Sequence, residues 1–326
     1  MADSKNVLSK EENIIKILIL AILSIGFSAL AFYLLSQYLL NLESNILIKS
    51  LIFFAGLLAM LILDTFFIKS LRKLGLIVLF IAVLATALFY QHFSNILLIG
   101  GIIFFVLTFW AVKEGADNLN NSLEIRFFKV AATFLPKLVT GLLIFLSIIF
   151  YVVYFGPNPV EIKAEKRNQL IGKALDFSQP IFKKWVPTFS SSMTFGDFLK
   201  TLTEQKIKAS ISEPLPAKVL KSATEKVSQE LKLSLEKTTG PVSDSQPLTE
   251  VVYLAARHYL NNLPPSLQMF IGPVIIFFVF LFLKGLAFLF YWPIEFFAFL
   301  VFKLATVSGF ATSTVESKSQ EVIFLN

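Results

Sequence analysis

The chain has 326 residues and a formal net charge of +7, and 56% of its residues are hydrophobic whereas only 16% are charged. Because charged residues make up about a quarter of an ordinary soluble domain, this composition excludes a chain that is soluble along its whole length. The chain has no cysteine and only two histidines, which excludes disulfides, thiolate nucleophiles, iron–sulfur clusters and cysteine-ligated zinc, and argues against a histidine-rich metal site.

Long apolar runs fill most of the chain up to residue 155. A helix needs about 20 apolar residues to cross the hydrocarbon core of a bilayer, with a lower limit of about 17. After an N-terminal tail (1–13), five runs satisfy this requirement, the third and fourth at its lower limit: 14–40, 46–68, 74–90, 96–112 and 138–155. The first continues beyond Ala31, so we expect an uncleaved anchor and not a signal peptide. The sequence thus predicts five membrane spans here.

The basic residues around these runs predict an orientation. Lys and Arg in short loops mark the cytoplasmic side of a membrane protein. They lie before the first run, after the second and after the fourth, at Lys5, Lys10, Lys16, Lys69, Arg72, Lys73, Lys113, Arg126, Lys129 and Lys137. The alternate loops, 41–45 and 91–95, contain neither, although Lys49 follows the first of them closely. We therefore expect a cytoplasmic N-terminus and an extracytoplasmic location for the residues that follow the fifth run.

The segment 113–137 is predicted to be a cytoplasmic amphipathic linker. Its apolar residues share one helical face, at Leu119, Leu123, Phe127, Val130 and Phe134. Polar residues, including Asn121 and Glu124, lie on the opposite face. This pattern is typical of a helix in the membrane interface. The linker either forms an elbow that leads into the fifth span at Pro136 or docks a cytoplasmic partner.

Residues 156–266 have the composition of a soluble domain, and their pattern predicts amphipathic helices. Four helices are expected, ending near Asp176, near Lys208, before Gly240 and at Leu263. The second begins at a capping box formed by Thr194 and Asp197. We expect a small extracytoplasmic helical domain whose apolar stripes either pack together or bind a partner helix.

The charge of this domain narrows the choice of partners. Its mild basic excess suits anionic lipid or cell-wall polymer, and equally a solvated surface. The basic residues are spread along the helices without a dense cluster, so we expect no nucleic-acid partner.

The C-terminal membrane region, 267–310, is expected to be interrupted. A span is predicted over 269–291, after which Trp292 and Pro293 should break the helix. The weaker run 294–309 is either a second span or a helix that lies in the interface. The tail, 311–326, is extracytoplasmic in the first case and cytoplasmic in the second.

Four charged residues within the apolar runs are candidate functional residues: Asp64, Lys284, Glu295 and Lys303. An ionisable side chain in a span is costly, and such groups often mark transport paths or proton relays. Asp64 lies near the cytoplasmic end of the second span, where it is either hydrated or part of a relay. Lys284 is expected to extend its ammonium to the interface, or to be neutralised by Glu295 if the chain turns before it. Lys303 is expected at the far interface or on the polar side of an interfacial helix.

No catalytic or cofactor-binding motif stands out from the sequence. Phosphate-binding glycine loops, nucleophile elbows, zinc-helix motifs and paired carboxylates are all missing from it. We therefore expect a non-enzymatic, cofactor-free, multi-pass protein of the plasma or inner membrane. It would contact the lipid bilayer and present its extracytoplasmic helices to protein partners, for envelope interactions or complex assembly.

Two other classes of function stay open. The main alternative is a transporter or channel component in which Asp64, Lys284 and Glu295 lie near a hydrated path. A membrane-embedded enzyme would instead need carboxylates of the soluble domain, such as Asp176 and Asp197, to converge above the bilayer.

The order of apolar spans, helical insert, Trp292–Pro293 and final apolar run resembles uncharacterised polytopic membrane proteins of small-genome bacteria. The resemblance concerns the layout, and it implies no functional residue and no activity.

Overall fold

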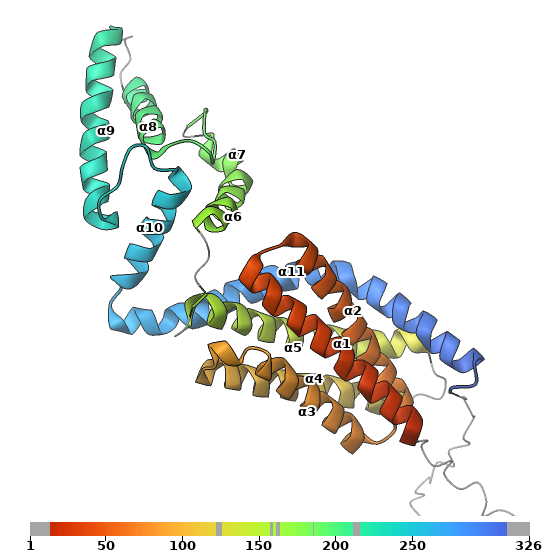
Figure 1. Cartoon of the computed structure of the whole chain (residues 1–326). Coiled ribbons are helices and arrows are strands. Elements are labelled where there is room, and N and C mark those ends of the chain that lie inside the picture. The colour runs from red at the N-terminus through yellow and green to blue at the C-terminus, as the bar shows by residue number, and fades with distance from the viewer. Residues whose placement is uncertain are drawn as a thin grey trace, which may run out of the picture. The chain divides into compact units, whose positions relative to one another are not determined.

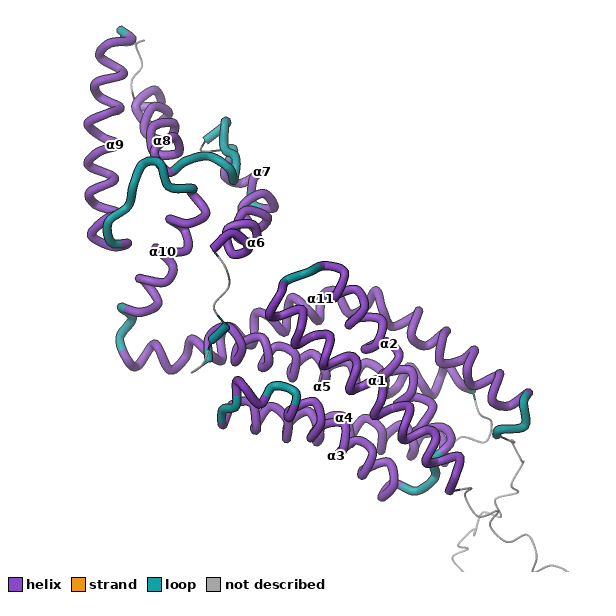
Figure 2. Tube along the Cα trace, viewed as in Figure 1, coloured by secondary structure: helices purple, strands orange, loops and turns teal. Residues whose placement is uncertain are grey.

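A computed structural model describes residues 14–121, 126–156, 159–160, 164–184, 186–210 and 216–311. In this part all the regular elements are helices (Figure 2), as predicted for an all-α fold. The chain divides into two compact units, with boundaries after Val160 and before Pro273. We call the middle unit the helical insert and the unit formed by the two flanking parts the membrane bundle. The predicted tails lie outside the described residues, apart from Ala311.

The membrane bundle is built from long helices that occupy the predicted apolar runs (Figure 1). They are α1 (Ile14–Asn41), α2 (Ser44–Phe67), α3 (Leu71–Ala87), α4 (Asn95–Asn120), α5 (Phe127–Phe155) and α11 (Pro265–Val307), with a 3-10 turn, η1 (Tyr90–His92), before α4. The helix α1 packs along α2, α4 packs along α5, and α3 packs on both α1 and α4. Apolar runs form helices because a helix bonds its own backbone N–H and C=O groups where no water is present to do so.

The helix α11 differs from the prediction for the C-terminal region. It is one continuous helix of 43 residues that passes through Pro273 and Pro293. The predicted break at Trp292 and Pro293 is therefore wrong, and the runs 269–291 and 294–309 belong to the same helix. Proline removes one backbone N–H and its hydrogen bond, but membrane helices tolerate this loss.

The helix α5 also continues through a proline. It begins at Phe127 and contains Pro136, so the elbow predicted at Pro136 is wrong. The hydroxyl of Thr140 donates a hydrogen bond of 2.6 Å to the Pro136 carbonyl. The predicted linker 113–137 is divided between the end of α4 and the start of α5, and its residues Leu123 and Glu124 lie outside the described part.

Within the described residues, five helices are long and apolar enough to cross a membrane: α1, α2, α4, α5 and residues Phe270–Val307 of α11. The sequence predicts six or seven crossings. One difference arises because α3 has 17 residues and so measures about 26 Å, at about 1.5 Å per residue. The other arises because the last two apolar runs form one helix. By helix length and hydropathy, the chain is a multi-span membrane protein.

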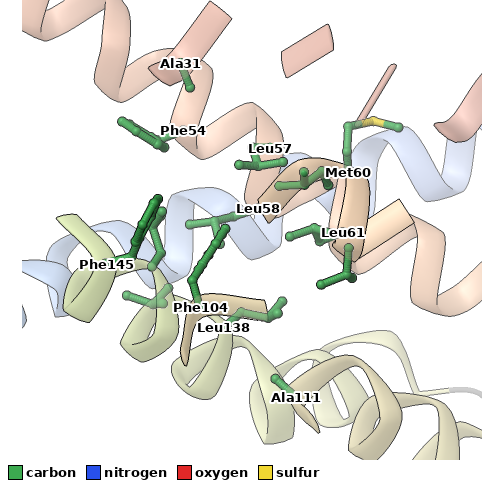
Figure 3. Packing of buried hydrophobic residues seen from close by; sticks show 14 of the residues in the cluster. Ala31, Phe54, Leu57, Leu58, Met60, Leu61, Phe104, Ala111, Leu138 and Phe145 are labelled. Atoms are coloured by element: carbon green, nitrogen blue, oxygen red, sulfur yellow. The ribbon is translucent and has the colours of Figure 1, made fainter. Parts of the chain in front are cut away.

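The core of the bundle contains phenylalanine rings from α1, α2, α4 and α5. Figure 3 labels three of them, Phe54, Phe104 and Phe145. The rings of Phe104 on α4 and Phe145 on α5 are stacked with centroids 5.0 Å apart. Phe32 on α1 meets Phe54 on α2 edge to face, also at 5.0 Å. Aromatic pairs of this kind contribute about 0.5–1.5 kcal/mol beyond the area that they bury. Phe32 also meets Phe145 at 5.7 Å and Phe104 at 6.3 Å, and these contacts connect the first helical pair to the second.

The helical insert has a core of its own. Its helices are α6 (Ala164–Phe177), α7 (Gln179–Phe182), α8 (Phe195–Ser210), α9 (Ala217–Thr239) and α10 (Leu248–Asn261). The buried core consists of Val186, Phe189, Phe195, Leu199, Val242, Leu248 and Val251. The four predicted helices correspond to α6, α8, α9 and α10, whereas the short α7 was not predicted.

Local sequence signals set the ends of two helices in the insert. Before α8, the Thr194 hydroxyl accepts a hydrogen bond of 3.2 Å from the backbone N–H of Asp197 and donates one of 2.7 Å to its carboxylate. The predicted cap is therefore present. The helix α9 ends before Gly240, whose φ of 81° lies in the region that favours glycine.

Candidate functional sites

Asp64 is the most deeply buried of the four predicted charged residues. It lies on α2 and is only 1% exposed. Its Oδ2 accepts a hydrogen bond of 2.6 Å from the hydroxyl of Ser24 on α1, and its Oδ1 has no hydrogen-bond partner among the described residues. Ser28, one turn further along α1, is fully buried, and its hydroxyl also lacks such a partner. The interior of the bundle therefore surrounds the Asp64 carboxylate.

Lys284 binds oxygen atoms of α5 and of its own helix. Its Nζ lies 2.6 Å from Oγ1 of Thr140, 3.2 Å from the Tyr291 hydroxyl and 3.4 Å from the Pro136 carbonyl oxygen. Thr140 lies near the middle of α5. These contacts hold the ammonium against α5, and the predicted extension of Lys284 to the interface stays a prediction.

Glu295 and Lys303 lie apart from Lys284. Because α11 is continuous, Glu295 is about 16 Å from Lys284 along the helix axis, at about 1.5 Å per residue. The turn that would let the two side chains neutralise each other is therefore missing. Glu295 is half-buried, whereas Lys303 is exposed, with its Nζ 5.7 Å from the centre of the Phe299 ring.

The four predicted charges do not form one site. Within the described residues, no hydrogen bond or ion pair joins any two of them. Asp64 contacts α1, whereas Lys284 contacts α5. Each therefore has to be considered as a separate candidate.

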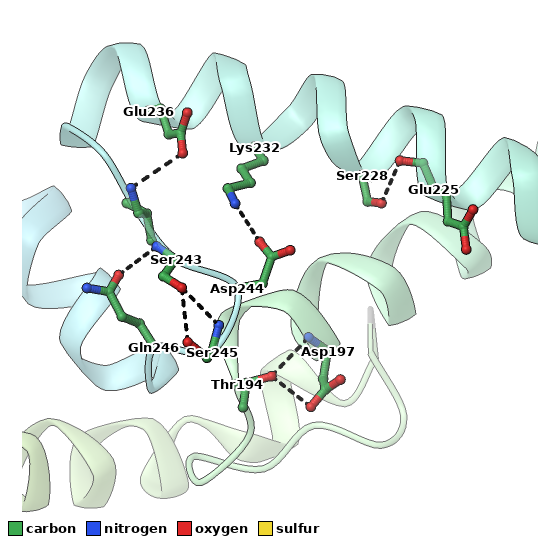
Figure 4. Close-up of polar contacts among 11 residues, drawn as sticks. Thr194, Asp197, Glu225, Ser228, Lys232, Glu236, Ser243, Asp244, Ser245 and Gln246 are labelled. Atoms are coloured by element: carbon green, nitrogen blue, oxygen red, sulfur yellow. Dashed lines mark hydrogen bonds and ion pairs between the residues drawn. The ribbon is translucent and has the colours of Figure 1, made fainter.

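A groove in the helical insert was not predicted. It has a volume of about 450 Å³ and is lined by α8, α9 and the loop after α9, including Leu199, Lys200, Leu233 and Asp244. Nζ of Lys232 lies 2.8 Å from Oδ1 of Asp244 (Figure 4). This hydrogen bond to Asp244 raises the pKa of Lys232 above its ordinary value of 10.5. Sequence reasoning missed the groove because Asp244 reaches α9 only after the chain reverses at Gly240.

One glycine allows the loop to approach α8 beside this groove. The backbone N–H of Gly196 donates a hydrogen bond of 3.0 Å to the Asp244 carbonyl. A Cβ atom at position 196 would lie 2.9 Å from Cβ of Asp244, which is too close for two carbon atoms. The loop thus reaches α8 because residue 196 has no side chain.

A smaller cavity of about 220 Å³ lies at one end of the membrane bundle, between α1 and η1. Aromatic, amide and imidazole groups line it, among them Tyr33, Gln37, Gln91 and His92. No Asp, Glu, Lys or Arg is among its lining residues in the described part of the chain. The cavity therefore suits a neutral, partly apolar group.

Among the residues that the structure describes, no three His, Asp or Glu side chains gather where they could hold a metal ion. Comparison of the chain with protein-family models, with curated proteins and with solved structures finds no match. The class that the fold itself defines is a multi-span helical membrane protein with a helical insert.

Proposed function

We propose that the chain is a non-enzymatic membrane protein that presents its helical insert on the extracytoplasmic side, where the insert binds a protein component of the cell envelope. The observation that carries this proposal is the separate core of the insert. In the part of the insert that the structure describes, the seven buried core residues, from Val186 to Val251, all belong to the insert itself. A unit that folds around its own core can serve a purpose distinct from that of the membrane helices.

The groove between α8 and α9 is the part of the insert that best fits a protein partner. Its lining includes the apolar residues Leu199 and Leu233, and Leu233 is 56% exposed. Charged residues of both signs, such as Lys200 and Glu225, lie around them. An exposed apolar residue among charges of both signs suits a protein partner, whereas a nucleic-acid site would be predominantly basic.

The assembly role is tested by the native size of the full chain in mild detergent. We expect the chain to migrate as part of a larger complex, and Leu233→Asp to release it, because a charge in the groove opposes apolar contact. Lys226→Asp is the matched control, since Lys226 lies on the same helix, is exposed and does not line the groove. A wild-type chain that migrates alone would contradict the proposal, as would a complex that Leu233→Asp leaves intact.

The proposed orientation is tested with single cysteines, because the natural chain has none. A membrane-impermeant maleimide added to intact cells should label Ser222→Cys in α9 and Gln91→Cys beside α4. It should label Lys69→Cys, between α2 and α3, only after the cells are opened. This pattern requires α3 to cross the membrane despite its 17 residues. Equal labelling of Lys69→Cys and Gln91→Cys in intact cells would show that α3 does not cross.

Transport is the second candidate function, and the burial of Asp64 favours it. A carboxylate enclosed in a membrane bundle is a common component of ion pathways. In liposomes, a transporter would produce a flux that Asp64→Asn abolishes and that Leu233→Asp leaves unchanged.

A further inference from the structure

Three buried side-chain oxygen atoms of the membrane bundle have no hydrogen-bond partner among the described residues: Oδ1 of Asp64 on α2, the hydroxyl of Ser28 on α1 and the hydroxyl of Thr108 on α4. The first two belong to helices that pack along each other, and neither takes part in the presentation of the insert. Asp64 is 1% exposed, and Ser28 is 0% exposed. Buried polar atoms normally have at least one partner, so two exceptions on neighbouring helices need an explanation.

Ser24 places these groups in one neighbourhood. Its hydroxyl donates the 2.6 Å hydrogen bond to Oδ2 of Asp64, which fixes the carboxylate against α1. Ser28 follows Ser24 by four residues, so the two serines lie on the same face of α1. Ser24 is also 0% exposed, and all three side chains are therefore shielded from the surface of the bundle.

No charged side chain in the described part of the chain offsets the Asp64 carboxylate. The helices α1, α4 and α5 pack on α2, and α11 reaches it through the contact between Phe66 and Phe302. The charged residues of these helices are Lys16, Lys49, Glu114, Lys113, Asp117, Lys129, Lys137, Lys284, Glu295 and Lys303. None of them forms a hydrogen bond or an ion pair with Asp64.

A carboxylate charge that is buried with a single hydroxyl donor is strongly disfavoured, because it has given up its hydration without gaining a counter-ion. We propose that Asp64, with Ser24 and Ser28, binds a small monovalent cation inside the membrane bundle. The cation is either a proton on Oδ1 or a sodium ion held by Oδ1 and the serine hydroxyls. This site is independent of the role proposed for the insert, and it does not require transport.

The test is thermal unfolding of the full chain in detergent, compared with Asp64→Asn, which keeps the shape of the side chain and removes its charge. Tm is measured from pH 5 to pH 9, in sodium chloride and in choline chloride at equal ionic strength. A ligand that binds only the folded state raises Tm by mass action. We expect the Tm difference between the wild type and Asp64→Asn to change by at least about 3 °C across these conditions.

The two salts distinguish the two cations. With a proton, the Tm of the wild type falls relative to that of Asp64→Asn as the pH rises, and both salts give the same result. With sodium, the Tm of the wild type is higher in sodium chloride than in choline chloride, and Asp64→Asn shows no such difference. A Tm difference that is constant in pH and in both salts would overturn the proposal.

A second variant keeps the test decisive if Asp64→Asn does not fold. Ser24→Ala retains the carboxylate and removes its one hydrogen-bond donor. If the cation is a proton, the fall of Tm should extend to a higher pH than in the wild type, and if it is sodium, the stabilisation by sodium should shrink because one ligand is lost. Ser36→Ala is the matched control, because the Ser36 hydroxyl bonds only to the Tyr33 carbonyl of its own helix. A response of Ser24→Ala equal to that of Ser36→Ala would also contradict the proposed cation site.

The native-size experiment with Leu233→Asp does not involve Asp64, so failure of one proposal is distinguishable from failure of the other.

Discussion

Lys284 ties α11 to α5 through neutral oxygen atoms. The Thr140 hydroxyl takes part twice, since it accepts from Lys284 at 2.6 Å and donates to the Pro136 carbonyl at 2.6 Å. The Tyr291 hydroxyl lies 3.2 Å from the same ammonium. In apolar surroundings each of these oxygens replaces part of the hydration that the ammonium has lost. Lys284 therefore forms a polar cross-link between α11 and α5.

Thr140→Val should destabilise the bundle, because it removes the nearest oxygen partner of Lys284 at almost constant volume. We expect a loss of about 1–3 kcal/mol, as for other buried charged groups that lose a hydrogen bond. Thermal unfolding in detergent measures it. Thr306→Val is the control, because the Thr306 hydroxyl bonds only to the Lys303 carbonyl of its own helix. In a double mutant with Lys284→Met the losses should be less than additive, and full additivity would contradict the cross-link.

The ion pair of Lys232 and Asp244 should make a small, pH-dependent contribution to the stability of the insert. The pKa of Lys232 is raised by its hydrogen bond to Asp244. A raised pKa means that the stabilisation is complete below the ordinary value of 10.5 and is lost as the pH rises through the higher value of the folded state. Asp244→Asn should therefore lower Tm slightly at pH 8, and not at pH 12. Because the pair lies at the surface, high salt should also reduce the effect, and salt-independence would exclude this explanation.

Helix pairs in the bundle approach closely where one partner has a glycine. On α4, a Cβ atom at Gly115 would lie 2.7 Å from the Phe134 ring of α5, and one at Gly100 would lie 2.8 Å from the Ile148 side chain. The two glycines flank Phe104 on α4, and their partners Phe134 and Ile148 flank Phe145 on α5, so both close approaches lie on either side of the stacked pair along these helices. Small residues at helix contacts allow the backbones to pack tightly in lipid, where no hydrophobic effect drives the helices together.

Gly115→Ala should weaken the contact between α4 and α5, although alanine is the better helix former. The added methyl group overlaps the Phe134 ring, and overpacking of this kind costs about 1–3 kcal/mol. Gly26→Ala makes the same chemical change on α1, where no atom lies within 4 Å of the added carbon. We expect it to leave stability unchanged or to raise it by up to about 1 kcal/mol. Thermal unfolding of the two variants side by side checks this, and equal Tm shifts would contradict it.

At the scale of the whole molecule, the length of the apolar runs predicted the membrane helices. The reason is that backbone N–H and C=O groups in hydrocarbon have no water to bond, and a helix bonds them to each other. The same reasoning failed at Pro136 and Pro293, where it applied a rule for helices in water to helices in an apolar setting. The contact between Lys284 and Thr140 could not be predicted from the sequence either, because Thr140 is far away in the chain and carries no charge. Asp64 could be selected from the sequence, but its burial beside Ser24 depends on how two helices face each other. The side of the membrane on which the insert lies stays a prediction.

The length of α11 has a consequence for the membrane around it. Its apolar segment of 38 residues measures about 57 Å at about 1.5 Å per residue, whereas a hydrocarbon core is about 30 Å thick. Membrane helices tilt by up to about 40° from the bilayer normal. At that tilt the apolar segment still extends about 44 Å along the normal, which is more than the thickness of the hydrocarbon core. Such a mismatch is relieved only where the bilayer thickens around the helix or where one apolar end lies among the headgroups. In the first case the chain should accumulate in the thickest membrane of the cell, and in the second it should show no such preference.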